Sequence, residues 1–263
     1  MTDLPFYQVD AFVTGRGALS GNPAAVMPMD EWLPDAVMRD IAGENNLSET
    51  AFLVPSARDD ADYDLRWFTP TVEVNLCGHA TLATAHVVLG EGTVRFATRS
   101  GILSVSRSQG LLWLDMPAST LAEVGVTGEA EALGADVLGV WSVTGGNGGE
   151  VVLLDSEETL RALTPDFARV AGISNGFIIA TAPGTNTDFA SRIFCPSFGI
   201  DEDPVTGSAH CALVPFWAAR LGMDRLTAVQ ASKRGGLLEC EVRGDRVLLG
   251  GSCATVIEGR FTL

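Results

Sequence analysis

Basic residues are scarce in this chain. Lys and Arg together number 17 against 33 Asp and Glu, so the formal net charge is −16. An acidic chain repels nucleic-acid phosphates and anionic lipids, so we expect neither a nucleic acid nor a membrane surface as a partner. The sequence also lacks a run of about 20 consecutive apolar residues, the length that a membrane-spanning helix needs. These deficits argue against a nucleic-acid-binding protein and against a membrane protein.

Cysteine is sparse, and the familiar cofactor motifs are missing. The five cysteines are scattered, odd in number and form no CxxC pair, which suits a reducing compartment better than a disulfide framework. The first residues show neither a basic region nor a long apolar one, so we expect a cytoplasmic protein. Cys77, His79 and His86 are too few for a tetrahedral zinc site, and no P-loop or dinucleotide-binding fingerprint occurs. We therefore expect no metal and no organic cofactor.

The 263 residues, 46% of them hydrophobic, are enough for one large domain or two small ones. Several short motifs recur in the same order at offsets between 125 and 131, which indicates an internal duplication. The matched motifs are Gly21-Asn22 with Gly146-Asn147, Pro34-Asp35 with Pro165-Asp166, Ala42-Gly43 with Ala171-Gly172, Phe52 with Phe177, and Arg66-x-Phe68-x-Pro70 with Arg192-x-Phe194-x-Pro196. Seven residues beyond the last proline stand Cys77 in one half and Asp203 in the other.

Each half predicts the same series of strands and helices. Amphipathic helices with Pro at the start and Gly at the end are expected over residues 34–42 and 165–171. Helices that are apolar on nearly every side are expected over residues 80–89 and 208–221, with a kink at Pro215. Strands are expected over residues 7–13, 24–27, 50–54, 64–68, 94–98, 101–106 and 111–116, and over residues 141–144, 151–154, 176–180, 190–194, 228–230, 237–242 and 246–250.

A helix that is apolar all round must be buried, and in a chain without membrane spans a sheet must surround it. The predicted fold is therefore α+β, with two similar lobes that each roll a β-sheet around one central helix. We place the first lobe at residues 1–118 and the second at 119–252. The final strand, 253–263, can return to the first lobe.

The starts of the two buried helices are the first candidate for chemistry. Gly78-His79 and Thr206-Gly207-Ser208 put small polar residues where unpaired backbone N–H groups and the positive end of the helix dipole attract anions. Thr206 and Ser208 can instead simply cap a helix. Because the arrangement recurs in both halves, we favour a site that binds an anionic small molecule.

Four titratable residues lie near these segments: Glu49, Cys77, His79 and Asp203. Each also has a purely structural interpretation. Glu49 can be a solvated turn residue, Asp203 a charge that favours the helix dipole, His79 a helix-start residue and Cys77 a small buried apolar group.

Four segments in this order, SGNPAAV, ENNLSETAF, LCGHATLATAHVVL and DEDPVTGSAHCAL, resemble the phenazine-biosynthesis isomerase-like (PhzF-like) family. The resemblance covers nearly the whole chain, and this family shares the two-lobed fold of diaminopimelate epimerase and proline racemase. It implies a cofactor-independent isomerase in which Glu49 is the general acid/base, while His79 and Asp203 line the site. It also implies that substrate-binding groups come from Asn22, Ser48, Cys77, Gly78, Thr206, Gly207 and Ser208. The family's phenazine member is a dimer, so a homodimer is expected.

Two differences from these relatives keep other functions open. The epimerases and racemases use one cysteine per lobe, whereas this chain has Cys77 in the first lobe and no cysteine at the corresponding point of the second. The phenazine enzyme has Ala-Gly-His-Pro where this chain has Cys77-Gly78-His79-Ala80. The alternatives are an epimerase that uses Cys77 with an unconventional partner such as Asp203, and a non-catalytic binding protein of the same fold.

Overall fold

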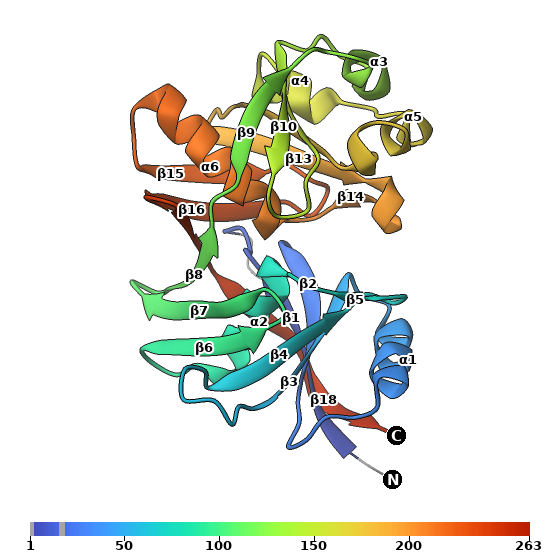
Figure 1. Cartoon of the computed structure of the whole chain (residues 1–263), viewed down its shortest axis with the longest axis vertical. Coiled ribbons are helices and arrows are strands. Elements are labelled where there is room, and N and C mark those ends of the chain that lie inside the picture. Colours follow the sequence, from blue (N-terminus) through green and yellow to red (C-terminus); the bar gives the residue numbers. More distant parts are fainter. Residues whose placement is uncertain (1–2, 16–18) are drawn as a thin grey trace. The chain divides into compact units, whose positions relative to one another are not determined.

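In the computed structural model, which describes residues 3–15 and 19–263, the chain forms two units. One unit contains Met1–Asp115 and Gly250–Leu263, and the other is Met116–Leu249. The chain passes from the first unit to the second within strand β8, Leu111–Pro117 (Figure 1), and returns within strand β17, Arg246–Gly251.

The first unit is built on a sheet with the strand order β18-β1-β2-β3-β4-β6-β7-β8. A two-residue strand, β5, pairs with β4. The strands are β1 Asp3–Ala11, β2 Asn22–Pro28, β3 Glu49–Pro55, β4 Tyr63–Phe68, β5 Glu73–Val74, β6 Thr93–Thr98, β7 Gly101–Ser108, β8 Leu111–Pro117 and β18 Cys253–Thr262, and the helices are α1 Asp35–Asn45 and α2 Gly78–Val88.

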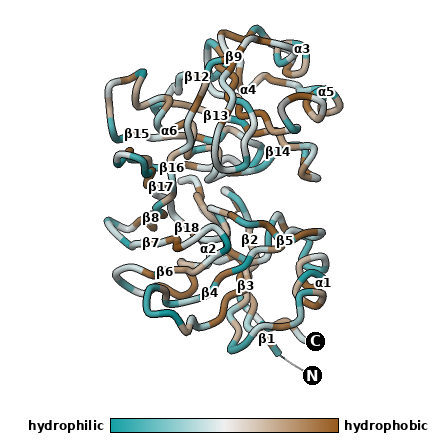
Figure 2. Tube along the Cα trace, viewed as in Figure 1, coloured by the Kyte–Doolittle hydropathy of each residue, from teal (hydrophilic) through white to brown (hydrophobic). Residues whose placement is uncertain are grey.

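Helix α2 is the centre of the first unit. Every residue from Gly78 to Ala85 is buried, and the helix packs against β1, β2, β3, β7 and β18. Strands from both ends of the sheet order therefore contact one helix, which means that the sheet curls around it. Helix α1 is amphipathic, as its alternating brown and teal turns show (Figure 2), and it packs on β3 and β4 through Met38, Ile41 and Ala42.

The second unit repeats this plan with the strand order β9-β10-β11-β12-β13-β15-β16. Its strands are β9 Thr120–Val124, β10 Gly139–Thr144, β11 Glu150–Leu153, β12 Ile178–Pro183, β13 Phe189–Cys195, β14 Ile200–Asp203, β15 Arg225–Gln230, β16 Gly236–Arg243 and β17 Arg246–Gly251. Its helices are α3 Glu129–Leu133, α4 Glu157–Ala162, α5 Phe167–Ala171 and α6 Gly207–Leu221, with 3-10 turns η1 Ser174–Gly176 and η2 Pro196–Phe198.

Helix α6 is the buried helix of the second unit and packs against β9, β15 and β16. It continues through Pro215. Proline has no N–H group, so it leaves the carbonyl of Cys211, four residues earlier, without its helical partner. The backbone N–H of Ser119 donates to that carbonyl at 3.0 Å. A loop before β9 thus satisfies the group that Pro215 leaves open.

The two units pair corresponding strands in the same way. The β2–β3 and β11–β12 pairs are parallel, the β3–β4 and β12–β13 pairs antiparallel, and the β4–β6 and β13–β15 pairs parallel again. The duplication inferred from the short motifs therefore extends to strand topology.

Two of the sequence correspondences are wrong in detail. Arg66 pairs with Phe52, whereas its repeat partner Arg192 pairs with Ala180, so Phe52 corresponds to Ala180 and not to Phe177. The residues that cap the buried helices are Cys77 and Thr206, so Cys77 corresponds to Thr206 and not to Asp203. The first mismatch arose because Phe52-Leu53-Val54 resembles Phe177-Ile178-Ile179. The second arose because the loops before α2 and α6 differ in length.

Several short elements of the second unit also differ from expectation, among them the strands β9 and β14, which were not predicted. Helix α5 starts at Phe167, two residues later than predicted, because the Asp166 side chain accepts from the N–H groups of Ala168 and Arg169 and caps it. Helices α3 and α4 were not predicted, since each is too short to show a periodic pattern.

Within the described residues, no helix is long and apolar enough to cross a membrane.

Candidate active site

Glu49 and His79 form a mostly buried ion pair in the first unit. Glu49 is the first residue of β3, and His79 is the second residue of α2. His79 Nε2 lies 3.1 Å from Glu49 Oε2, and the two side chains are 6% and 18% exposed. Neither atom makes a well-aligned hydrogen bond to the described residues. The pair therefore keeps hydrogen-bonding capacity that a bound molecule can use.

Asn22 and Ser48 lie on the other side of the imidazole. The Asn22 side-chain nitrogen is 3.2 Å from His79 Nδ1, and Ser48 Oγ donates to Asn22 Oδ1 at 3.3 Å. Asn22 is fully buried at the start of β2. The parallel pairing of β2 with β3 places Asn22 and Glu49 at the same end of the sheet, which explains why two residues that are 27 positions apart both contact His79.

Cys77 caps α2, and its Sγ lies 3.6 Å from His79 Nδ1. Burial, reinforced by the negative charge of Glu49, raises the pKa of the Cys77 thiol to about 11. The thiol is therefore protonated near neutral pH. Because the thiolate is the reactive form of cysteine, this environment does not favour Cys77 as a nucleophile or base.

The charge state of His79 depends on its neighbours. Burial on its own opposes the charged imidazolium, but the interactions with Cys77 and Glu49 outweigh burial and raise the pKa of His79 well above its ordinary value. With the Cys77 thiol neutral, the carboxylate of Glu49 is the physical source of this stabilisation. The ion pair with Glu49 thus favours the protonated form of His79.

Glu49, Cys77 and His79 are also a possible metal-ligand group, because one ligand atom from each lies within 4.8 Å of the others. However, His79 presents Nδ1 to Cys77 and Nε2 to Glu49. An ion bound to either ring nitrogen would therefore replace the present contact of that nitrogen.

In the second unit, Asp203 and Thr206 belong to one buried network. The Thr206 hydroxyl donates to an oxygen of the Asp203 carboxylate. Gln230, at the end of β15, ties the two together: its Oε1 accepts from the Thr206 N–H at 2.8 Å, and its Nε2 donates to the Asp203 carbonyl at 2.7 Å. Sequence reasoning missed Gln230. The only signal was an amide at a position that the alternation of the strand turns inward.

Gly207 and Ser208 are the first two residues of α6, as Gly78 and His79 are of α2. Ser208 Oγ accepts from the side chain of Asn147 at 3.2 Å. The repeated Gly-Asn turn thus places an asparagine beside the second residue of the buried helix in each unit. Sequence analysis identified Asn147 in the repeat but did not assign it to the site.

The predicted site residues therefore form two groups, one in each unit. Glu49, with Asn22, Ser48, Cys77, Gly78 and His79, belongs to the first group, and Asp203, Thr206, Gly207 and Ser208 belong to the second. Their catalytic and binding roles stay predictions.

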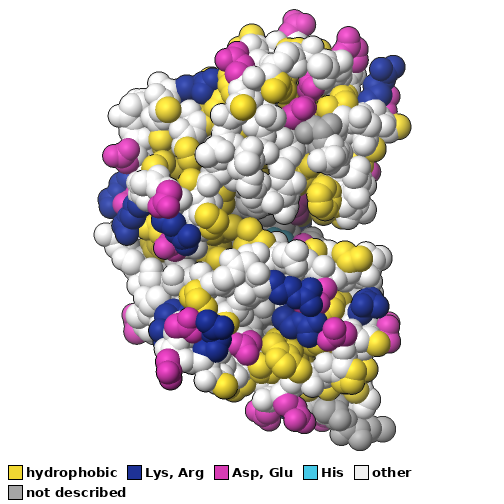
Figure 3. Space-filling view, viewed as in Figure 1, with side chains coloured by type: hydrophobic (Ala, Val, Ile, Leu, Met, Phe, Trp, Pro, Cys, Tyr) yellow, Lys and Arg dark blue, Asp and Glu magenta, His cyan; other side chains and the backbone are white. Residues whose placement is uncertain are grey.

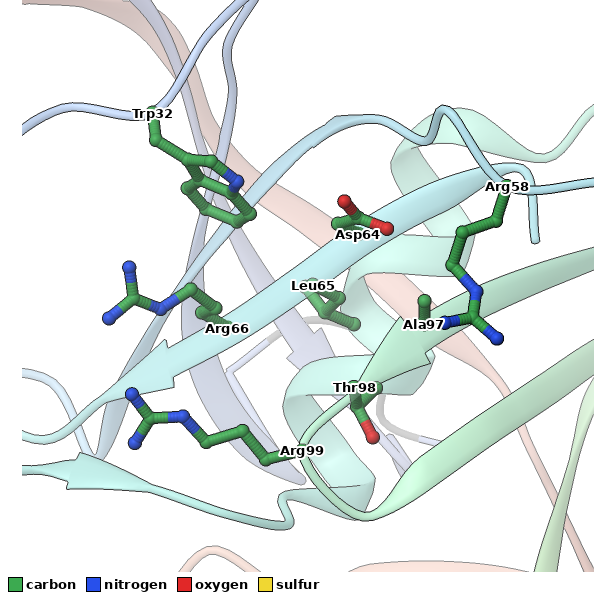
Figure 4. A pocket seen from close by; sticks show the side chains of 8 residues that line it. All are labelled: Trp32, Arg58, Asp64, Leu65, Arg66, Ala97, Thr98 and Arg99. Carbon is green, nitrogen blue, oxygen red and sulfur yellow. The ribbon is translucent and has the colours of Figure 1, made fainter.

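A separate hollow of about 320 Å³ in the first unit is lined by Trp32, Arg58, Asp64, Leu65, Arg66, Ala97, Thr98 and Arg99 (Figure 4). Its three arginines do not form an anion site, because each is paired. Arg66 bonds Asp35 and Glu73, Arg99 bonds Glu73, and Arg58 bonds Asp60. The same mixing of basic and acidic side chains is visible across the surface in Figure 3.

His210 in α6 predicts an acid sensitivity of the second unit. Its Nδ1 donates to the Thr206 carbonyl at 2.8 Å, and burial lowers the pKa of this histidine from 6.5 to about 4. Between these two values the unfolded chain binds a proton that the folded chain does not, so stability is complete above pH 6.5 and falls as the pH drops toward 4. We expect a loss of about 3 kcal/mol in the free energy of unfolding.

Urea unfolding at pH 7 and pH 4.5, followed by the fluorescence of the second unit's tryptophans, measures this effect. The His210→Gln variant should lose most of the difference between the two pH values, whereas the His86→Gln variant should keep it. An equal difference in the wild type and the His210→Gln variant would contradict the assignment to His210.

Comparison with known proteins gives one consistent family. The model of the phenazine biosynthesis-like (PhzC-PhzF) protein family matches residues 9–259. An uncharacterized isomerase of Pseudomonas aeruginosa is 50% identical over 267 residues, and the match covers 99% of each chain. A PhzF-family phenazine biosynthesis protein from Enterococcus faecalis, known from its crystal structure, has a TM-score of 0.92 at 42% identity and full coverage of both chains.

A hydroxyproline epimerase from Agrobacterium vitis, crystallised with trans-4-hydroxy-L-proline, has a TM-score of 0.64 at 11% identity, with 98% and 92% of the two chains covered. At this identity the likeness concerns the fold alone. Together the comparisons confirm the predicted resemblance and the predicted fold class.

Proposed function

The chain belongs to the phenazine biosynthesis-like (PhzF) family, and we propose that it is a cofactor-independent isomerase that moves a proton within a small, carboxylate-bearing metabolite. Relatives that carry the name isomerase support the reaction class. The observation that carries the proposal is the ion pair between Glu49 and His79, because it places a carboxylate oxygen that makes no well-aligned hydrogen bond to the described residues in a largely buried setting.

In the proposed reaction, a Glu49 oxygen takes a proton from one carbon of the substrate. The C–H bonding electrons form a new C=C bond, the adjacent double bond shifts, and Glu49 returns the same proton to a second carbon. Substrate and product are then isomers, and the carboxylate is regenerated. A single acid/base suffices when both carbons lie on one face of a planar substrate. His79 holds the carboxylate in position through its Nε2–H.

The start of α6 is the proposed anion-binding part of the site. Gly207 and Ser208 supply backbone N–H groups at the positive end of a 15-residue helix, and the Asp203–Thr206–Gln230 network holds that end in place. We propose that these N–H groups bind the substrate carboxylate or the negative charge that develops in the reaction.

The proposed function can be tested before the substrate is identified. Wild-type protein is incubated in D₂O with a panel of unsaturated and cyclic carboxylates, and deuterium uptake at carbon is followed by NMR and mass spectrometry. We expect a double-bond shift in at least one compound, with deuterium uptake to the extent that the proton on Glu49 exchanges with solvent before it is returned. Ligand binding with neither a double-bond shift nor exchange in any compound would favour the non-catalytic binding protein instead.

The Cys77→Ser variant distinguishes the proposed isomerase from the epimerase alternative. We expect the Cys77→Ser variant to keep its activity within about one order of magnitude, because the buried thiol has a pKa of about 11 and the corresponding residue in the second unit is Thr206. Steady-state turnover of the identified substrate measures this effect.

Iodoacetamide gives the matching control. Treatment of the wild type should leave turnover nearly unchanged, and the Cys253→Ser variant, altered at the partly exposed cysteine, should behave like the wild type. Loss of activity in Cys77→Ser by a factor of about 1,000, with inversion at a stereocentre as the reaction, would instead establish a cysteine-based epimerase.

A further inference from the structure

The start of α2 gathers a thiol, an imidazole and a carboxylate in a small volume. One ligand atom from each of Cys77, His79 and Glu49 lies within 4.8 Å of the others. Cys77 and His79 are buried, whereas the side chain of Glu49 is 18% exposed. A small ion can therefore approach the two buried side chains from the side of Glu49.

The distance between Cys77 and His79 is the one expected for two ligands of the same zinc ion. Tetrahedral zinc binds a histidine nitrogen at about 2.0 to 2.1 Å and a thiolate at about 2.3 Å, which places the two ligand atoms about 3.5 Å apart. His79 Nδ1 and Cys77 Sγ are 3.6 Å apart. An ion between them would take the lone pair of Nδ1, which now faces both Cys77 and the side-chain nitrogen of Asn22.

Glu49 supports the imidazole from the opposite side. His79 Nε2 lies 3.1 Å from Glu49 Oε2. A histidine that binds a metal ion through one ring nitrogen commonly donates its other N–H to a carboxylate, which orients the ring and makes it a stronger ligand. An ion at Nδ1 keeps this contact, whereas an ion at Nε2 would break it. The geometry therefore favours Nδ1, with Glu49 as the hydrogen-bond partner behind the ligand.

The charges also suit a divalent ion. In the ion-paired state, the imidazolium of His79 and the carboxylate of Glu49 cancel, and the Cys77 thiol is neutral. Zinc displaces the proton of the thiol and the proton on Nδ1. The thiolate and the carboxylate then balance the two positive charges of the ion. The group is thus neutral before and after binding, which matters because uncompensated charge is costly to bury.

We propose that Cys77 Sγ and His79 Nδ1 bind a zinc ion that inhibits the protein. Two protein ligands, instead of the four of a structural zinc site, make the binding reversible, so the ion is an inhibitor and not a resident cofactor. The inhibition rests on the proposed function of Glu49. A divalent charge beside its carboxylate disfavours the uptake of a proton, and this uptake is the first step of the proposed reaction.

Cobalt absorption tests the ion site without any substrate. Cobalt(II) accepts the same ligands as zinc but binds them less tightly, and a thiolate bound to it gives a charge-transfer band in the near ultraviolet. We expect the band when metal-free wild type is titrated with cobalt chloride, and its loss when zinc is added. Cys77→Ser should lack the band, and Cys253→Ser, altered at the partly exposed cysteine, should keep it. No band in the wild type, or an equal band in Cys77→Ser, overturns the site.

Zinc affinity tests the place of Glu49. We expect Glu49→Gln to bind zinc about 10 to 100 times more weakly, because the neutral amide neither balances the ion nor strengthens the imidazole ligand. Glu44→Gln, altered at an exposed position of α1, should bind like the wild type. Competition between zinc and cobalt measures both values, and circular dichroism shows that the variants are folded. Unchanged affinity in Glu49→Gln would contradict an ion at Nδ1 that is supported by Glu49.

Turnover separates this proposal from the proposed function. Once a substrate is identified, zinc should abolish its isomerisation, a chelator should restore it, and magnesium, which prefers oxygen ligands, should have no effect. Zinc that binds as described without reducing turnover would overturn the inhibition and count against Glu49 as the base. Failure of cobalt and zinc to bind would overturn the ion site alone, because Glu49 can still transfer the proton.

Discussion

Replacement of Glu49 by Gln should reduce turnover by a factor on the order of 10² to 10⁴. Glutamine has nearly the same shape but cannot take a proton from carbon. The loss should appear mainly in kcat, because glutamine keeps the shape of the side chain and leaves the groups around it unchanged. Stopped assays of the isomerisation, with substrate binding measured separately by calorimetry, check this expectation.

Glu44 provides the matched control for this variant. It lies exposed on α1, five residues from Glu49 in the sequence, so Glu44→Gln removes the same charge without touching the site. We expect wild-type turnover from Glu44→Gln and an unaltered far-ultraviolet circular dichroism spectrum from both variants. A folded Glu49→Gln protein with wild-type turnover would show that another group transfers the proton.

Replacement of Gly21 by Ala should destabilise the first unit by roughly 3 to 5 kcal/mol. Gly21 has a φ of 71°, which L-residues adopt only at a cost. In addition, a Cβ atom there would lie 2.2 Å from the Ala11 carbonyl oxygen, and a backbone atom cannot move aside as a flexible side chain can. Urea unfolding and the thermal midpoint, expected to fall by about 10 °C, measure the effect.

Gly90→Ala is the appropriate comparison. Gly90 follows α2, its φ is not positive, and nothing lies within 4 Å of an added Cβ. We expect its free energy of unfolding to stay within about 0.5 kcal/mol of the wild type. If Gly21→Ala were as stable as Gly90→Ala, the turn that places Asn22 would differ from the one described.

The secondary structure near the candidate site could be predicted because its patterns are strong. The all-apolar segments that became α2 and α6 could only be buried helices, and the Gly-Asn repeat correctly indicated that each lobe begins with the same turn. Short elements could not be predicted in this way. The five-residue helix α3 is fixed by tertiary contacts and by the Gly134 cap rather than by periodicity.

The composition of the site depended on the register of the strands, which the sequence does not reveal. Phe52 corresponds to Ala180, and Glu49 lies three residues before Phe52, so the counterpart of Glu49 is Phe177. The first lobe therefore has a carboxylate where the second has a phenyl ring. The contacts among Glu49, His79 and Asn22 arise from the parallel pairing of β2 and β3. Gln230 escaped detection because an amide at a strand end has no diagnostic spacing.

Position-resolved isotope transfer tests the central claim most directly. Substrate deuterated at the carbon that loses its proton is converted in H₂O, under single-turnover conditions, by the wild type and by the Glu49→Gln and Cys77→Ser variants. We predict that the wild type and Cys77→Ser deliver part of the deuterium to the receiving carbon of the same molecule, as one shuttling carboxylate requires, and that Glu49→Gln delivers none. Equal transfer by Glu49→Gln, or loss of transfer only in Cys77→Ser, would contradict the account.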